Sequence, residues 1–282
     1  MAGRIAFLGP VGTFTEQAAL AYAPAGKLVP FATIQAAARA VAAGTVEEAV
    51  VPIENSLEGS VTYTLDILIE EDRHFINNEL VIPIVHCLLA QPGTRIEEVR
   101  TVYSHPQALG QCREFLERAL PEVDLVASLS TVAAVEDLKG SASPAAAISP
   151  RRAAGLHGMD ILAHGIQDKS SNATRFVVLA PTDHAPTGRD KTSLCFSFDQ
   201  DSPGRLYGVM GEFAQRDINL AKIESRPTKQ SLGEYIFLVD CEGHREEPQV
   251  RAAIDGARRQ TSTLKILGSY PRWQAGEDRR AP

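Results

Sequence analysis

Short apolar runs alternate with alanine-rich helical patterns through the first 180 residues, and this alternation limits the possible folds more than any other feature. Residues 4–8 and 48–53 are expected to form strands, and residues 34–43 a helix. Strands that alternate with helices pack into sheets that helices cover. The sequence therefore predicts an α/β body for residues 1–180, with a second lobe at about 80–160.

The second lobe is expected to begin with one apolar strand at 79–90. A later strand at 101–104 leads through Ser104-His105-Pro106-Gln107 into a helix at 108–118. Proline is favoured in the first turn of a helix, which supports that start. His105 could either face a ligand or cap this helix, and the residues alone leave both open.

Residues 181–190 form a polar segment with proline and glycine, which is typical of a domain boundary. The segment that follows is predicted to contain a strand, a helix, two strands, a helix and a strand, at 193–198, 204–216, 220–225, 234–240, 248–259 and 264–267. The order βαββαβ is that of a ferredoxin-like unit. We expect it to span residues 191–273.

Two turns between a predicted strand and a predicted helix carry polar residues and glycine. Gly9-Pro10-Val11-Gly12 precedes Thr13-Phe14-Thr15-Glu16, which matches a capping box, and residues 54–60 end in Ser60, a candidate N-cap. Such turns expose backbone N–H groups that bind anions, although neither is a phosphate-binding P-loop or a dinucleotide motif. Each could be no more than a capped turn. Two in one sheet favour a ligand cleft.

Polar side chains also precede the apolar run 176–180, which reads as a buried strand. Arg175 carries a planar fork of donors suited to a carboxylate, and Thr174 has a hydroxyl that can donate and accept. Asn172 lies just before them. Taken alone, this stretch could also be a surface loop that enters a core strand.

Charge and cysteine usage exclude several classes of protein. A net charge of −7 and a pI near 5.6 argue against nucleic-acid binding. No apolar run approaches the roughly 20 residues that span a membrane, and the N-terminus does not resemble a signal peptide. The four cysteines are scattered and the histidines do not cluster. We therefore expect a cytoplasmic protein with no metal.

The motifs together resemble the bacterial prephenate dehydratase family over about residues 3–273. The matching segments are Gly9-Pro10-Val11-Gly12-Thr13-Phe14-Thr15-Glu16, Ile53-Glu54-Asn55-Ser56-Leu57-Glu58-Gly59-Ser60-Val61, Ser104-His105-Pro106-Gln107-Ala108-Leu109, Asn172-Ala173-Thr174-Arg175-Phe176 and Glu224-Ser225-Arg226-Pro227. The resemblance implies a two-lobed catalytic domain similar to type II periplasmic-binding folds, followed by an ACT regulatory domain. It implies conversion of prephenate to phenylpyruvate with loss of water and carbon dioxide. Aromatisation drives this reaction without a redox cofactor or metal.

The resemblance assigns the central role to Thr174, with Asn172, Arg175 and Phe176 as further catalytic residues. It implies substrate-binding roles for Thr13, Asn55, Ser56, Gly59, Ser60, Ser104, His105 and Gln107. A threonine hydroxyl is too weak an acid to deliver a free proton, so we expect Thr174 to hydrogen-bond the departing oxygen or to relay a proton from His105 or Glu54. Thr174→Ala should lose turnover, whereas Arg175→Ala should mainly weaken binding.

For the C-terminal unit, the resemblance implies that phenylalanine binds as an allosteric effector where paired ACT domains meet, in a homodimer or homotetramer. The implied effector residues are Gly204, Leu206, Asn219, Leu220, Glu224, Ser225, Arg226 and Pro227. Many relatives have alanine after this glycine, and the bulkier Arg205 could alter effector binding.

Other functions stay open at this point. An arogenate dehydratase would share these motifs, and a non-catalytic solute-binding protein would share the two lobes. A fused chorismate mutase is disfavoured, because the chain begins at the first predicted strand.

Overall fold

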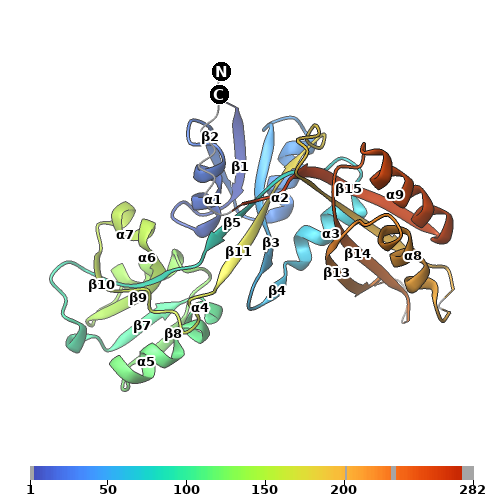
Figure 1. The fold of residues 1–282 in the computed structure, drawn as a ribbon. Helices are drawn as coiled ribbons and strands as arrows, with labels where there is room; N and C mark the ends of the chain where they lie inside the picture. Colours follow the sequence, from blue (N-terminus) through green and yellow to red (C-terminus); the bar gives the residue numbers. More distant parts are fainter. Residues whose placement is uncertain (1–2, 201, 230–232, 275–282) are drawn as a thin grey trace. The chain divides into compact units, whose positions relative to one another are not determined.

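The computed structural model describes residues 3–200, 202–229 and 233–274, and its strands form three sheets (Figure 1). The chain divides into two compact units. One consists of the residues up to Ala37, Val50–Val61 and Val81–Phe176, and the other of Ala38–Ala49, Thr62–Leu80 and the residues from Val177 onward. The three sheets with their helices confirm the predicted α/β class. The limits 1–180 and 191–273 for the two domains stay a prediction.

The first sheet contains the N-terminal elements and one strand that returns from later in the chain. Its strands and neighbouring helices are β1 (Arg4–Leu8), α1 (Phe14–Tyr22), β2 (Lys27–Phe31), α2 (Ile34–Ala42), β3 (Glu48–Asn55), β4 (Gly59–Ser60), α3 (Thr62–Glu70), β5 (Phe75–Pro83) and β11 (Ala173–Ala180). The strand order is β2–β1–β3–β11–β5, with β4 paired to β3. β3 and β11 are mostly buried apolar runs, as expected of central strands covered on both faces. This order places the start of β11 beside the end of β3.

The second sheet forms the second lobe. Its elements are β6 (His86–Ala90), a 3₁₀ turn (Ile96–Glu98), β7 (Thr101–Ser104), α4 (Pro106–Gln111), α5 (Arg113–Ala119), β8 (Asp124–Ala127), α6 (Ala133–Lys139), β9 (Ala145–Pro150), α7 (Arg151–His157) and β10 (Asp160–His164). The strand order is β10–β6–β9–β7–β8. Successive residues of β6 belong to different apolar clusters, Cys87 and Leu89 to one and Leu88 to the other. Side chains alternate along a strand, so both faces of this sheet are buried.

Two predicted elements of residues 1–180 differ in the structure, and one strand was not predicted. The apolar stretch 79–90 is two strands in different sheets, because β5 ends at Pro83 and β6 begins at His86. The helix expected at 108–118 is two helices, which meet at Cys112 with φ −117° and ψ 19°. β2 was not predicted; it lies at the edge of its sheet, where Pro30 is tolerated.

The third sheet confirms the predicted βαββαβ unit. Its elements are β12 (Asp190–Ser197), α8 (Arg205–Ala214), β13 (Leu220–Pro227), β14 (Tyr235–Glu242), α9 (Pro248–Gln260) and β15 (Thr263–Pro271), and the strand order is β13–β14–β12–β15. All neighbouring strands of this sheet pair in the antiparallel direction. A cluster that includes Phe196, Val209, Phe213 and Ile254 is buried between the sheet and its helices.

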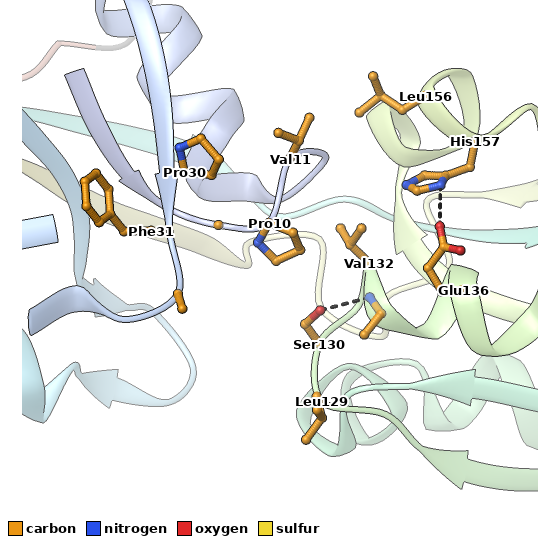
Figure 2. Close-up of a pocket in the computed structure, with 13 residues that line it drawn as sticks. Pro10, Val11, Pro30, Phe31, Leu129, Ser130, Val132, Glu136, Leu156 and His157 are labelled. Carbon is orange, nitrogen blue, oxygen red and sulfur yellow. Dashed lines mark hydrogen bonds and ion pairs between the residues drawn. The ribbon is translucent and has the colours of Figure 1, made fainter. Parts of the chain in front are cut away.

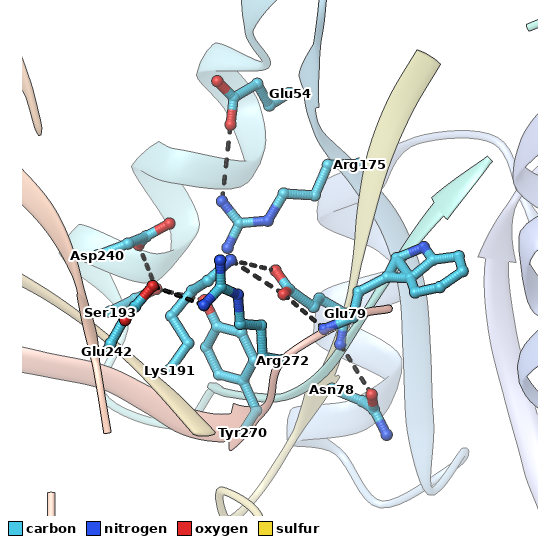
Figure 3. Close-up of polar contacts among 11 residues, drawn as sticks. Glu54, Asn78, Glu79, Arg175, Lys191, Ser193, Asp240, Glu242, Tyr270 and Arg272 are labelled. Atoms are coloured by element: carbon cyan, nitrogen blue, oxygen red, sulfur yellow. Dashed lines mark hydrogen bonds and ion pairs between the residues drawn. The ribbon is translucent and has the colours of Figure 1, made fainter. Parts of the chain in front are cut away.

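Buried and half-buried charges connect this unit to α3 and β5. Lys191 donates to both carboxylate oxygens of Glu79 at 2.9 Å, and Glu79 also accepts from the N–H of Trp273 (Figure 3). Lys265 donates to the carbonyls of Ile69 and Glu71 at the C-terminus of α3. A cation at that end of a helix is stabilised by the unpaired carbonyls.

Candidate active site

The Asn-x-Thr-Arg-Phe segment meets the end of β3 in a group of polar side chains. Nδ2 of Asn55 lies 2.9 Å from Oδ1 of Asn172 and 2.9 Å from Oγ1 of Thr174. All three side chains are buried, at 9%, 1% and 8% exposure. They meet because β11 lies directly beside β3 in the sheet.

The orientation of the Asn55 amide determines what Thr174 can do. Oδ1 of Asn55 accepts from the main-chain N–H groups of Leu57 and Glu58, at 2.9 and 3.1 Å. Its NH₂ group must therefore face Thr174, whose oxygen accepts. No acceptor for the Thr174 hydroxyl proton is found within residues 3–200, 202–229 and 233–274. Thr174 can thus donate that proton to a bound molecule.

Thr174 lines a cavity of about 320 Å³ between the two lobes. Of the predicted site residues, Thr13, Asn55, His105, Gln107, Thr174 and Phe176 line it. The donors come from both lobes, since α1 begins beside Thr13 and α4 beside His105. The N-terminal end of α1 can stabilise a bound anion, whereas the N–H of Gln107 at the start of α4 already donates to Nδ1 of His105 at 3.3 Å.

Of the two hydrogen bonds in the predicted capping box at the start of α1, the structure contains one. Thr13 accepts from the N–H of Glu16 at 3.3 Å, as predicted. The Glu16 carboxylate instead accepts from the N–H of Gly12 at 2.8 Å and pairs with Arg152 of α7. The carboxylate thereby links the first turn to the second lobe rather than closing the box.

Three other predicted site residues, Ser56, Ser104 and Asn172, are not among the residues that line the cavity. Ser104 is fully buried and donates to the carbonyl of Ile148 at 2.7 Å. Oγ of Ser56 accepts from the N–H of Ala173 at 3.0 Å. Asn172 holds Asn55 but is not itself part of the lining. Ser56 and Asn172 thus position the strand that carries Thr174.

Gly59 and Ser60 form β4, the short strand after the turn. They pair with Asn55 and Glu54 of β3, and the φ of 82° at Gly59 suits glycine. α3 begins at Thr62, so Ser60 lies too early to be the N-cap that the sequence suggested. Their substrate-binding roles stay predictions.

Arg175 is not among the residues that line this cavity. Neighbouring side chains on a strand point to opposite faces, so Thr174 and Phe176 share one face and Arg175 lies on the other. Its guanidinium lies 3.6 Å from the carboxylate of Glu54 (Figure 3). The predicted binding role of Arg175, and the relay role of Glu54, stay predictions.

Two residues that the sequence did not suggest complete the polar group. Oε1 of Gln111 accepts from Nδ2 of Asn172 at 2.9 Å and lies 3.0 Å from Nε2 of His86. Both Gln111 and His86 line the cavity, and burial lowers the pKa of His86. The four-residue spacing of Gln107 and Gln111 on α4 was a signal for Gln111. His86 had no local signal, because only the tertiary fold brings β6 here.

A larger cavity of about 910 Å³ adjoins the first, with which it shares Gly9, Leu129 and Ser130 (Figure 2). Pro10 and Val11 line one side and Val132 and Leu156 the other. Its titratable lining groups, Glu136 and His157, already pair at 2.8 Å. The polar groups suited to chemistry therefore belong to the smaller cavity.

The predicted effector residues lie at several places in the C-terminal unit, and their effector role stays a prediction. Asn219 lines a polar cavity of about 660 Å³ beside the start of β13 and donates to Glu242 at 3.2 Å. Gly204, with φ 88°, is the N-cap of α8, and Leu206 and Leu220 pack against the apolar core. Glu224, Ser225, Arg226 and Pro227 lie on β13. Arg226 donates to Asp66 of α3 at 3.1 Å.

The described residues contain no group of three or more potential metal ligands, and no helix among them could cross a membrane.

Comparison with known proteins identifies the family to which this chain is similar. The family model for prephenate dehydratase matches residues 5–184, and that for the ACT domain matches residues 200–258. A bifunctional chorismate mutase/prephenate dehydratase of Aquifex aeolicus is 44% identical over 270 residues, which are 95% of this chain and 74% of that protein. A prephenate dehydratase of Mycobacteroides abscessus is 39% identical over 279 residues, covering 95% of this chain and 90% of the relative.

A solved structure leads to the same family. The prephenate dehydratase of Arthrobacter aurescens in complex with L-Phe superimposes with a TM-score of 0.88 at 36% identity, over 95% of this chain and 90% of that one. Its similarity extends through both the lobes and the βαββαβ unit. With the Asn172–Phe176 motif at a cavity that both lobes line, and relatives that match almost its full length, this chain belongs to the prephenate dehydratase family.

Proposed function

We propose that the cavity of about 320 Å³ converts prephenate to phenylpyruvate, with Thr174 donating a hydrogen bond to the departing ring oxygen. The C–C bond to the ring carboxylate breaks, its electron pair aromatises the ring, and the C–O bond breaks. One proton is consumed as carbon dioxide and water leave. The observation that carries this role is the bond from Asn55 to Oγ1 of Thr174, which leaves the hydroxyl proton available.

A fixed donor at this oxygen favours the transition state over the bound substrate. Negative charge grows on the oxygen only as its bond to carbon breaks, so the hydrogen bond from Thr174 strengthens during that step. Asn55 is held by two main-chain N–H groups, so the donor does not need to reorganise. Thr174 need not transfer its own proton; water or His105 can supply the proton that the leaving oxygen requires.

The substrate carboxylates are proposed to bind at the helix starts. The lining of the cavity contains no lysine or arginine side chain among the described residues. N–H groups near Thr13, the side-chain amide of Gln107 and the hydroxyls of Ser130 and Thr131 supply donors instead. The carboxylate that leaves as carbon dioxide loses its charge, so a strong cation beside it would stabilise the ground state more than the transition state.

The purified protein tests this proposal directly. Incubated with prephenate, it should release phenylpyruvate, followed by ultraviolet absorbance in alkali. Arogenate, supplied in parallel, should give phenylalanine far more slowly. Faster turnover of arogenate would reassign the substrate, and binding of prephenate without any product would favour a solute-binding protein.

We further propose that phenylalanine inhibits the enzyme through β13 and α3. Arg226 and Lys229 both donate to Asp66 of α3, at 3.1 and 2.6 Å. α3 follows directly in the chain after β4, which pairs with the segment that carries Asn55. A shift of β13 on effector binding would therefore displace α3, the helix that follows Asn55 and β4 in the chain.

Asp66→Asn tests this route, with Glu70→Gln as the control because Glu70 is an exposed residue of the same helix. Asp66→Asn should raise the phenylalanine concentration for half inhibition about 5-fold or more, while the rate without phenylalanine stays within about 3-fold, because coupling energies are typically 1–3 kcal/mol. Unchanged inhibition in Asp66→Asn would refute the route. The cytoplasmic location and the homodimer or homotetramer stay predictions, and light scattering of the purified protein would measure its mass.

A further inference from the structure

His86 is a buried histidine of the cavity wall that the reaction described above does not yet use. It is the first residue of β6 and is 2% exposed. Its main-chain N–H donates to Oε1 of Gln167, and its carbonyl accepts from Gly165 and Ile166. The ring meets that of Phe14 edge to face, with centroids 5.6 Å apart. Backbone and ring are therefore held in one orientation.

Three side-chain amides, those of Asn55, Asn172 and Gln111, lead to His86 through hydrogen bonds. The direction of these bonds is determined at Asn55, the amide farthest from His86. The main-chain N–H groups of Leu57 and Glu58 can only donate, so Asn55 turns its NH₂ group to Asn172. Asn172 accepts with Oδ1 and therefore offers Nδ2 to Gln111. Each amide thus fixes the orientation of the next one.

Oε1 of Gln111 is consequently an acceptor, and its second contact is Nε2 of His86 at 3.0 Å. This hydrogen bond requires the histidine proton on Nε2 and leaves a lone pair on Nδ1. Nδ1 is buried and has no hydrogen-bond partner in the part of the chain that the structure describes. Burial also lowers the pKa of His86, which favours the neutral ring.

We propose that His86, neutral and protonated on Nε2, is a positioning residue for Gln111 in the dehydration. Asn172 and His86 together occupy both lone pairs of the Gln111 carbonyl oxygen, so the amide cannot turn over without losing two bonds. The NH₂ group of Gln111 then remains to donate, both to Glu58 at 3.4 Å and to the contents of the cavity.

The orientation of Gln111 matters because prephenate presents acceptors. A carboxylate or a departing oxygen is stabilised by an amide NH₂ group and repelled by an amide carbonyl. His86 therefore keeps Gln111 in the orientation that suits an anionic substrate. This role rests on the proposed function, whereas the protonation of His86 does not.

Nuclear magnetic resonance of the wild-type protein tests the protonation first. Histidine ring nitrogens are labelled with ¹⁵N, and the His86 signal is assigned by its loss in His86→Gln. The expected pattern is a proton on Nε2 and a bare Nδ1 near neutral pH. A proton on Nδ1 alone, or on both nitrogens, would overturn the proposal. The pattern does not depend on turnover, so it is informative even if prephenate proves not to be the substrate.

Kinetics then test whether His86 acts through Gln111. His86→Leu should lower kcat/KM for prephenate roughly 3- to 10-fold, the range for one lost hydrogen bond, and His86→Gln should restore most of it. In a Gln111→Met background, His86→Leu should have less than about a 2-fold further effect, because coupled residues are not additive. Two results would contradict the positioning role. One is an equal loss of kcat/KM from His86→Leu in both backgrounds, and the other is a His86→Leu variant with the kcat/KM of the wild type.

Discussion

Replacement of Thr174 by valine tests the central step most directly, because valine has nearly the same shape and lacks the hydroxyl. The variant removes the hydroxyl that donates to the departing oxygen in the proposed reaction. Loss of a comparable donor lowers kcat about 10²- to 10³-fold, or about 2.7–4 kcal/mol of transition-state stabilisation. KM should change little, since the hydrogen bond strengthens only as the C–O bond breaks. Initial rates of phenylpyruvate formation at saturating prephenate would measure the loss.

The fold should tolerate this change. The NH₂ group of Asn55 also contacts Oδ1 of Asn172 and the carbonyl of Ala173, so it keeps acceptors when Oγ1 of Thr174 is removed. We expect a loss of about 1 kcal/mol in the free energy of unfolding, measured with urea. Thr174→Ser is the matched control and should retain most of the activity. A valine variant with a kcat within about 3-fold of wild type would refute the reasoning, because no donor of the required strength would then be missing.

Three further changes test other parts of the structure. Asn55→Asp keeps an oxygen that accepts from the N–H groups of Leu57 and Glu58, but its second oxygen makes Thr174 donate its proton to residue 55 instead of to the substrate. The value of kcat should therefore fall about 10²-fold, and a variant with the kcat of the wild type would show that the hydroxyl proton is not needed at the substrate. Lys191→Met leaves Glu79 buried without its cation and should lower the free energy of unfolding by about 3–5 kcal/mol in urea titrations, and a loss below about 1 kcal/mol would contradict that burial. The lowered pKa of His86 means that the unfolded chain binds its proton more readily than the folded protein, so stability should decline as the pH falls below about 6.5, and His86→Gln should reduce that decline; equal slopes for both proteins would contradict it.

Much of the fold followed from local pattern. The Thr13 cap, the start of α4 at Pro106 and the βαββαβ order of the C-terminal unit all depend on side chains within one turn or one strand of each other. Such short-range preferences are readable in a single sequence. The division of 79–90 into two strands was not readable, because an apolar run does not show which sheet receives each half.

In the candidate site, too, some features could be predicted from local sequence and others could not. Local patterns in the sequence were enough to predict that Thr174 stands just before a buried strand and that polar residues gather at strand-to-helix turns. The three-dimensional structure was needed to find that Asn55 donates to Thr174, that Arg175 lies on the other face of β11, and that His86 and Gln111 complete the group. Strand order and the direction of each hydrogen bond depend on partners far apart in the chain, so no local pattern of residues encodes them.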